Sequence, residues 1–458
     1  MYNYSGWAFP AGIGTGSCLK NYTGNRSDAG RSGKETMRIW LVTVGEPLPS
    51  DEDKPRLHRT GILADAALRK GHEVVWWSST FDHAKKVHRF SRAATLNPAP
   101  GLTLKLLHSI GYKSNVSLAR MYNHYMLGRQ FARLAPQEPQ PDVILASMPT
   151  IELSLESARY GKARNIPVAL DMRDMWPDIF VKLAPAPVQP IARAMLHPLF
   201  SMLEEAASKA VAITGMSEPF VEWGLGYAGR TATPRDRWFP FAYSEQQPSG
   251  PEVEAAFGFW EKHGIKRGDG KFTVCFFGML GRQFDIETVI EAARKLSSSG
   301  PDIRFVLCGS GDNLEKYRRL SADCQNVLLP GWVNKAQVWT LMRLSSAGLA
   351  PYRSSPDFEM SYPNKPMEYM SAGLPVVSSL GGILRELLAA RDCGITYPKG
   401  DPDGLAHTLI SLQNNPVRCR QLSANSSKTF EEMFMAEKVY PGMISWLQDI
   451  SISGTSLT

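Results

Sequence analysis

The sequence predicts an α/β protein with two doubly wound parallel sheets, and three observations lead to this prediction. Short apolar segments alternate with amphipathic segments from residue 37 onward, which is the pattern of strands joined by helices. A chain of 458 residues is too long for one ordinary hydrophobic core. Between about 240 and 270 the composition becomes rich in Gly, Pro and charge, which indicates a connection between two domains.

The first series of elements lies between residues 37 and 240. Its strands are expected at 37–44, 72–79, 141–147, 167–174 and 209–215, and its helices at 59–71, 154–165 and 216–227. A loop rich in Pro and acidic residues follows the first strand. Because ligands of doubly wound sheets bind at the carboxyl ends of the strands, the loops after these strands are where functional residues are expected.

The second series begins near residue 271. Its strands are expected at 271–278, 303–311, 326–332, 346–352 and 375–378, and its helices at 285–296, 366–372 and 429–450. We therefore place the domains at 37–240 and 241–436, followed by a terminal helix and flexible tail at 437–458. Residues 1–36 are rich in Gly, Ser, Asn and Tyr without periodicity, so we expect a disordered extension there.

Composition argues against several classes of protein. The net charge of +7 is moderate for this length and includes no block of Lys and Arg, so nucleic acid is not an expected partner. No apolar run reaches the roughly 18 residues of a transmembrane helix. The six cysteines contain no Cys-x-x-Cys pair and the nine histidines show no ligand spacing. We therefore expect a cytoplasmic protein with reduced thiols and no metal site.

The most informative segment is Pro363–Ser379, PNKPMEYMSAGLPVVSS, in which Lys365 and Glu368 lie at the start of a short helix. The free N–H groups and the dipole of a helix N-terminus favour an anion, and a lysine adds a point charge suited to phosphate. Glu368 can accept hydrogen bonds from the two hydroxyls of a ribose. The segment predicts a nucleotide-diphosphate pocket, with an ordinary αβα unit and a surface Lys–Glu pair as the alternative.

The block PNKPMEYMSAGLPVVSSLGG, followed by RELL and GITYPKGDPDGLA, resembles the donor-binding signature of retaining GT-B glycosyltransferases, in the bacterial glycosyl transferases group 1 family. It is similar to the branch that builds capsule, O-antigen and exopolysaccharide. The likeness covers about residues 37 to 450 and is strong only in the second half. It implies two Rossmann-like domains facing a cleft, a C-terminal helix that returns to the first domain, and retention of anomeric configuration.

Glycine turns extend the implied donor site. The resemblance places Gly278, Gly281 and Arg282 beside the donor pyrophosphate, although Phe284-Asp285 stands where many relatives carry a second lysine. Gly309 belongs to a second turn near the donor, with a simple turn capped by Asp312 as the alternative.

Two further parts of the donor site concern the base and the sugar. Trp332 and Val333 follow the glycine that flanks the base in the family, so Trp332 stacks on a uracil or packs in the core. Relatives carry a glutamate that would fall on Met360, so we expect Glu359, or backbone groups with Asp357, to hold the sugar.

The segment DMRDMWPD at 171–178 ends a predicted strand of the first domain. Carboxylates and an arginine at the end of a buried strand are costly unless they are paired or used. The segment is similar to the D-x-W-P-E/D segment of the same branch. Asp174 is our candidate for positioning or deprotonating an acceptor hydroxyl, with Arg173, Trp176 and Arg59 as acceptor contacts. A salt-bridge cluster of Asp171, Arg173 and Asp174 is the alternative.

These residues suggest an enzyme that moves a sugar from a UDP-sugar to a glycan or lipid-linked acceptor. Lys365, Arg282 and helix N-termini would stabilise the leaving diphosphate without a metal or another cofactor, and Asp174 would act on the acceptor. The resemblance suggests a hexosyl or N-acetylhexosaminyl transferase in surface polysaccharide synthesis, including lipopolysaccharide. A UDP-sugar 2-epimerase of the same fold and a non-catalytic nucleotide-sugar-binding protein are the alternatives.

The segment Gly101–Ala135 mixes apolar side chains with Lys and Arg and contains no Asp or Glu. We interpret it as basic amphipathic helix that lies on an anionic bilayer, at the inner face of the cytoplasmic membrane. The alternative is a helix that faces the core and presents a solvated basic side.

Overall fold

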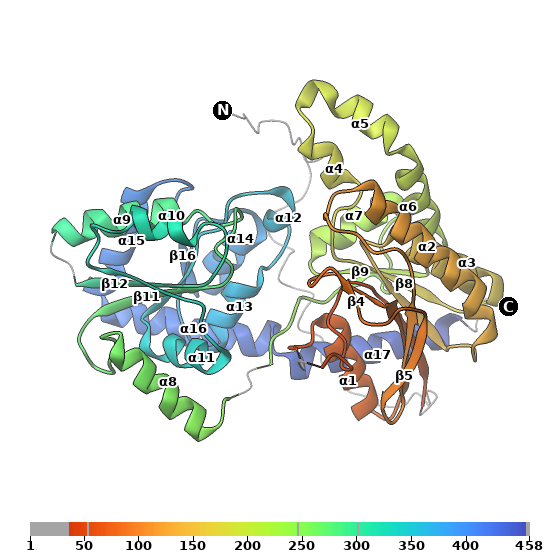
Figure 1. The fold of residues 1–458 in the computed structure, drawn as a ribbon, viewed down its shortest axis with the longest axis horizontal. Helices are drawn as coiled ribbons and strands as arrows, with labels where there is room; N and C mark the ends of the chain where they lie inside the picture. The colour runs from red at the N-terminus through yellow and green to blue at the C-terminus, as the bar shows by residue number, and fades with distance from the viewer. Residues whose placement is uncertain (1–35, 53–54, 245–246, 300–301, 455–458) are drawn as a thin grey trace. The chain divides into compact units, whose positions relative to one another are not determined.

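The computed structural model describes residues 36–52, 55–244, 247–299 and 302–454. The extension predicted at 1–36 therefore lies outside the described residues, apart from Thr36. Two large parallel sheets, each covered by helices, form the described part of the chain (Figure 1). The prediction of an α/β fold with two doubly wound domains is confirmed.

The first sheet has the strand order β10-β9-β8-β7-β1-β2-β6-β5 within the described residues. Every neighbouring pair is parallel except β5 with β6. The strands are β1 Arg38–Val42, β2 Glu73–Ser79, β5 Ala94–Ala99, β6 Leu102–Leu107, β7 Val143–Ser147, β8 Val168–Met172, β9 Ala212–Gly215 and β10 Arg237–Trp238. Strands β7 and β8 are buried along their whole length, as expected for parallel strands with helices on both faces. A small antiparallel pair, β3 Phe81–Asp82 and β4 Val87–His88, lies after β2.

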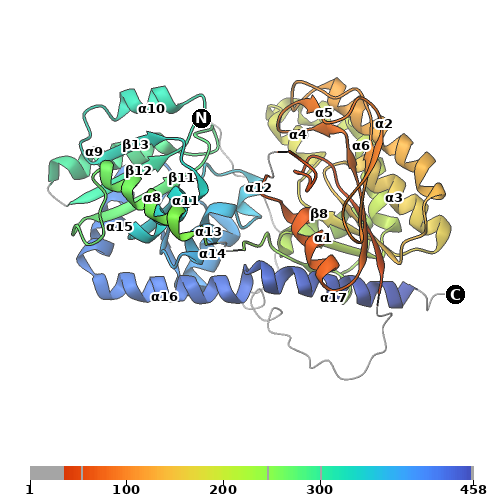
Figure 2. The same ribbon diagram turned by 60° about the horizontal axis from the view of Figure 1, so that its bottom comes forward.

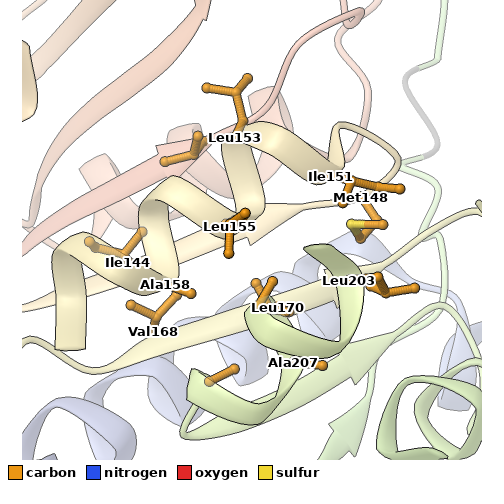
Figure 3. Packing of buried hydrophobic residues seen from close by; sticks show 14 of the residues in the cluster. Ile144, Met148, Ile151, Leu153, Leu155, Ala158, Val168, Leu170, Leu203 and Ala207 are labelled. Atoms are coloured by element: carbon orange, nitrogen blue, oxygen red, sulfur yellow. The ribbon is translucent and has the colours of Figure 1, made fainter. Parts of the chain in front are cut away.

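Helices cover both faces of this sheet. They are α1 Arg59–Arg69, α2 Leu118–Leu134, η1 Ala135–Gln137, α3 Ile151–Arg164, α4 Asp178–Leu183, η2 Ala186–Val188, α5 Gln189–Met195, α6 His197–Lys209 and α7 Glu218–Ala228. One core joins the sheet to α2, α3, α6 and α7, and Figure 3 shows Leu155 of α3 and Leu203 of α6 within it. Successive residues of β1 point to opposite faces, because Trp40 belongs to this core and Leu41 to the core on the other face.

The second sheet has the order β13-β12-β11-β14-β15-β16, and all its neighbouring pairs are parallel. Its strands are β11 Phe272–Phe277, β12 Ile303–Cys308, β13 Val327–Gly331, β14 Ala347–Ala350, β15 Val376–Ser378 and β16 Gly394–Thr396. Its helices are α8 Gly250–Lys262, α9 Ile286–Ser299, α10 Leu314–Leu320, α11 Lys335–Leu344, α12 Pro356–Glu359, α13 Asn364–Ser371, α14 Gly382–Arg391, α15 Pro402–Asn414 and α16 Pro416–Met433. The strand order reverses between β11 and β14, and ligands of doubly wound sheets bind at such a switch point.

The last helix, α17 Ala436–Gly454, packs against the first sheet although it follows the second in sequence. Figure 2 shows α17 alongside α1 and continuing from the end of α16. Tyr440, Met443 and Leu447 are buried with residues of α1 and β1, and Trp446 donates a hydrogen bond to the carbonyl of Arg235 at 2.7 Å. Residues 451–454, which we expected in a flexible tail, extend this helix, and 455–458 lie outside the described residues. The domain boundaries that we placed at 240 and 436 stay predictions.

The interpretation of Gly101–Ala135 as basic amphipathic helix is wrong for its first part. Residues Leu102–Leu107 form β6, which pairs with β2 and β5, and Lys105 forms an ion pair with Glu138 at 2.6 Å. Helix α2 forms only from Leu118, and it buries Leu127 and Phe131 in the core. The alternative of a core-facing helix therefore holds for α2. Within the described residues no helix is both long and apolar enough to cross a bilayer.

Candidate functional site

Lys365 and Gly278 meet at the switch point of the second sheet. Gly278 follows β11 with φ +145°, and Lys365 lies in the first turn of α13, after β14. A Cβ on Gly278 would stand 2.2 Å from Nζ of Lys365, so only glycine leaves room for the lysine. Two motifs that the sequence suggested separately are thus parts of one arrangement.

The Lys365 ammonium lies among three aromatic rings. Its Nζ is 5.3 Å from the ring centroid of Phe276, 5.6 Å from that of Phe277 and 5.2 Å from that of Phe284. Burial lowers the pKa of Lys365, and the negative charge of Glu368 opposes this effect. Within the described residues the ammonium has no ion pair, and a half-buried cation without a direct carboxylate contact is suited to an anionic ligand.

The turn after β12 packs directly on the turn after β11. A Cβ on Gly309, where φ is +154°, would lie 1.8 Å from the carbonyl oxygen of Gly278. Gly278 N–H donates to the carbonyl of Cys308 at 3.0 Å, and Gly309 N–H donates to that of Gly331 at 2.7 Å. The alternative role of Asp312 as a helix cap is not observed, because α10 begins after Asn313. The backbones of three strand ends therefore form one tightly packed surface.

The turn Gly278–Arg282 leaves its basic residue exposed. Arg282 has no hydrogen bond or ion pair in the part of the chain that the structure describes, so its guanidinium is available to a ligand. Gly281 lies in this turn and its N–H donates to Met279 at 2.8 Å. Phe284 supplies one of the rings around Lys365 in place of a second cation. Asp285 accepts a hydrogen bond from Thr288 at 2.8 Å in the first turn of α9.

Glu368 has a partner that its sequence neighbourhood does not indicate. Its Oε1 accepts from Arg56 at 2.9 Å, with Arg56 62% exposed and Glu368 15% exposed. Arg56 belongs to the loop before α1, so this ion pair joins the two halves of the described chain. Its guanidinium also lies 4.6 Å from the ring centroid of Tyr243. A ribose that uses Glu368 has to share it with Arg56 or displace Arg56.

The remaining donor candidates surround this region. Glu359 ends α12, accepts a hydrogen bond from Ser354, and its carbonyl oxygen would be 2.0 Å from a Cβ on Gly382. Trp332 is 71% exposed, which removes the alternative that it packs in the core, whereas Val333 is buried. Trp332 therefore has a free ring face that a base could cover.

The first half carries a buried ion network at the ends of β1 and β8. Arg59 bonds Asp171 at 2.9 Å and the carbonyls of Phe239 and Pro240 at 2.7 and 3.0 Å. Arg173 bonds Asp171 at 2.6 Å and also pairs with Glu46. Burial pushes the pKa of Asp171 upward, but the two guanidinium groups hold it below its usual range.

This network decides between the interpretations of the DMRDMWPD segment. The side chain of Arg59 is fully buried and that of Arg173 nearly so, and the described residues occupy both guanidinium groups. The structure therefore gives both arginines partners in the fold, and their roles as acceptor contacts stay predictions. The salt-bridge cluster exists, but Asp174 is not part of it.

Asp174 stands apart from the network and keeps its carboxylate available. Its Oδ1 accepts the N–H of Met175 at 2.8 Å. Burial raises the pKa of Asp174 to about 6, and the charge of Asp357, from α12 of the second half, adds to the rise. A carboxylate with a pKa near 6 can take a proton from a hydroxyl more readily than an ordinary aspartate can. The indole of Trp176 is 8% exposed and packs against Phe180 at 4.5 Å between centroids.

Contacts from both halves converge on these residues. Besides the pair of Arg56 and Glu368, the hydroxyl of Ser217, after β9, donates to the carbonyl of Met360 at 2.5 Å. The segments that contain these four residues, Arg56, Glu368, Ser217 and Met360, each follow the carboxyl end of a strand. Sequence reasoning missed Arg56 as the partner of Glu368, since the two residues are 312 positions apart and no local pattern links them. No group of His, Cys, Asp or Glu in the described ranges has the arrangement of a metal site, and metal independence stays a prediction.

Comparison with known proteins agrees with this architecture. Residues 260–429 match the family described as Glycosyl transferases group 1. The 2-deoxystreptamine N-acetyl-D-glucosaminyltransferase of Niallia circulans is 22% identical over 38% of this chain and 45% of its own length. WcaL of Escherichia coli (strain K12), provisionally named a colanic acid biosynthesis glycosyltransferase, is 30% identical over 28% of this chain and 32% of its own.

The chain thus spans less than half the length of these two curated relatives. The crystal structure of Anabaena Alr3699/HepE in complex with UDP-glucose superposes with a TM-score of 0.57 at 14% identity, covering 92% of this chain and all of the other. The chain therefore has the GT-B fold, and its residues 260–429 match the glycosyl transferases group 1 family.

Proposed function

We propose that the protein is a glycosyltransferase that moves a hexosyl or N-acetylhexosaminyl group from a UDP-sugar to a glycan or lipid-linked acceptor, with retention of configuration. The observation that carries the proposal is the unpaired ammonium of Lys365 against Gly278 at the switch point of the second sheet. The family match and the UDP-glucose complex of the Anabaena protein support a nucleotide-sugar donor. The relatives named for aminosugar transfer and polysaccharide synthesis support the sugar class and the pathway.

The mechanism is electrostatic on the donor side. As the glycosidic bond to the diphosphate breaks, negative charge grows on the leaving phosphate, and Lys365, Arg282 and the N-terminus of α13 stabilise it. We infer that these groups make a metal ion unnecessary. The retaining reaction is a front-face displacement through a short-lived oxocarbenium ion. Asp174 positions the acceptor hydroxyl or accepts its proton.

Calorimetry with UDP tests the donor site. Lys365→Ala should weaken UDP binding by roughly 10- to 150-fold, since a charge-assisted contact is worth about 1.5–3 kcal/mol. Lys428→Ala is the matched control, because Lys428 is exposed on α16 in the same half. Unchanged UDP affinity in Lys365→Ala would refute the assignment.

Product analysis separates the activities. We expect UDP release from a UDP-sugar to depend on a glycan acceptor. Interconversion of UDP-N-acetylglucosamine with its 2-epimer, in the absence of acceptor, would identify the epimerase instead. Binding of UDP-sugar without any turnover across acceptors would identify a binding protein.

We also propose that α4, η2 and α5 rest on an anionic bilayer at the inner face of the cytoplasmic membrane. Ile191 is 60% exposed and Met195 77%, and Leu183 and Val188 are exposed as well. The sequence from 179 to 203 has no Asp or Glu; of its two cations, Lys182 has a buried Nζ and Arg193 pairs with Asp178 at the start of α4 at 3.7 Å. The exposed apolar side chains are therefore the feature that suits a lipid surface.

Vesicle co-sedimentation tests this surface. Ile191→Glu combined with Met195→Glu should abolish binding to vesicles that contain anionic lipid, and salt should weaken binding of the unaltered protein. Val417→Glu is the control, since Val417 is 69% exposed on α16. Vesicle binding that survives the double substitution would exclude α5 as the contact.

A further inference from the structure

Two cations lie together at Tyr112 without an ion pair to a carboxylate in the described part of the chain, and one of them, Arg120, is close enough to the proposed acceptor residue Asp174 to affect its pKa. Both cations lie against the ring of Tyr112: Nζ of Lys86 is 4.8 Å from the ring centroid and Cζ of Arg120 is 5.4 Å from it. Both also hold Asn115, since Lys86 donates to its side-chain oxygen at 2.5 Å and Arg120 to its carbonyl at 2.8 Å. We call Lys86 and Arg120 the cation pair.

Arg120 connects the cation pair to the acceptor region. It lies in the first turn of α2, and its guanidinium lies 4.4 Å from the ring centroid of Trp176. Its Nε is buried and has no hydrogen-bond partner among the residues that the structure describes. Burial lowers the pKa of Arg120, with the charge of Asp174 acting in the opposite direction. Stacking between two rings holds the guanidinium in place while leaving part of its hydrogen-bonding capacity unused.

The surrounding groups do not neutralise the cation pair. Asp82 is held by Arg89 at 3.2 Å and by the N–H groups of Ala84 and Lys85. His83 is neutral at physiological pH because burial, Lys86 and Arg120 lower its pKa to about 4. Burial and the charge of Arg120 lower the pKa of Lys86 as well. Like charges held this close favour an anion between them.

We propose that the cation pair binds a negatively charged group of the acceptor, a phosphoryl or carboxylate group, beside the hydroxyl that Asp174 positions. The inference rests on the proposed function and names the acceptor as an anionic molecule. Such a group can accept a hydrogen bond from the part of the guanidinium that Asn115 does not hold, and the lysine adds a point charge. A sugar phosphate or a lipid diphosphate would supply the phosphoryl group, and a uronic acid would supply the carboxylate.

Calorimetry on UDP-saturated protein tests the proposal, because UDP occupies the donor site before the second anion is added. Pyrophosphate and glucuronate are the two titrants, and the tighter one indicates the source of the charge. Lys86→Asn and Arg120→Gln should each weaken binding by about tenfold or more, or 1.4 kcal/mol. Asn suits position 86 because Lys86 has φ +59°. Arg129→Gln is the control, as Arg129 is exposed on the same helix.

The outcomes are distinct. Binding that both variants lose and the control keeps supports the cation pair. Absence of second-anion binding in the unaltered protein, or equal binding by Lys86→Asn, overturns it while leaving the glycosyltransferase assignment intact. Failure of UDP itself to bind overturns the donor assignment instead. If Arg120→Gln has a lowered Tm because the stacking is lost, the anion binding measured for Lys86→Asn decides the test.

Discussion

The two candidate half-sites are built in different ways. On the donor side, glycines at the ends of β11 and β12 bring backbone against backbone and leave Lys365 unpaired. On the acceptor side, Asp171 is fully buried between Arg59 and Arg173, so most charges are already neutralised before any ligand arrives. The donor side therefore depends on shape and on the free charges of Lys365 and Arg282, while the acceptor side depends on a prearranged ion network that keeps Asp174 separate. Substitutions should consequently fail for different reasons in the two halves.

The largest effect is expected from Gly278→Ala. The new methyl would stand 2.2 Å from Nζ of Lys365, so the ammonium has to leave the position that we propose for it beside the leaving phosphate. We expect turnover to fall roughly 1000-fold, as when a preorganised charge-stabilising group is removed. Steady-state kinetics measures this loss.

Gly226→Ala in α7 is the control, because a Cβ there has nothing within 4 Å. If Gly278→Ala and Gly226→Ala turned over equally, close packing at the donor turn would not matter.

Asp174→Asn should act on chemistry and leave the fold intact. We expect kcat to fall about 100-fold, the lower range for loss of a general base. In the unaltered protein kcat/KM should decline as the pH falls below about 6, where Asp174 takes up a proton, and the variant should lose this step.

Asp174→Asn should raise the stability of the fold although it lowers activity. The folded-state pKa of Asp174 is raised, so the carboxylate costs nothing below pH 3.8, and its cost grows as the pH rises toward 6. Above about pH 6 the cost reaches up to about 3 kcal/mol, at 1.36 kcal/mol per pKa unit. Asp174→Asn should therefore raise Tm at pH 7. A lowered Tm would show that the carboxylate holds the fold together, as Asp171 does.

Trp332→Ala is expected to have a modest effect, on the donor side alone. Because the indole is 71% exposed, Tm should not change. Loss of stacking on the base should raise the KM for donor about fivefold, close to 1 kcal/mol. Trp332→Phe should recover most of this loss, and an unchanged KM in Trp332→Ala would place the base elsewhere.

Removal of divalent metal is expected to change nothing. If Lys365 and Arg282 supply the positive charge at the diphosphate, turnover in EDTA should match turnover in Mg²⁺. An absolute requirement for Mg²⁺ or Mn²⁺ would mean that the donor side is incomplete without an ion.

The parts of the proposed donor side could be located from the sequence, because they are local. Each glycine turn directly follows an apolar strand, and Lys365 and Glu368 share one helix turn. Their convergence followed from the carboxyl ends of parallel strands lying at one edge. The period-two pattern of LTLKLL also indicates β6, whereas the basic residues that continue through α2 favour a helix over the whole segment.

The acceptor side could not be predicted to the same depth. Lys86, Tyr112 and Arg120 come from three segments with no fixed spacing, and their meeting depends on how α2 packs on the sheet. The sequence offered Asp171 as a partner of Arg173, but it could not indicate the second partner, Glu46, which lies 127 positions away. Side-chain networks of this kind are products of tertiary packing, and a local motif can show their members but not their partners.

The position of α17 has a consequence for synthesis on the ribosome. Tyr440, Met443 and Leu447 complete the core of a sheet whose first strand is made about 400 residues earlier. That sheet must wait, with α1 and β1 partly uncovered, until the final helix emerges from the exit tunnel. A nascent chain stalled before Ala436 should therefore recruit chaperones through its first half, although every strand of that half has already been translated.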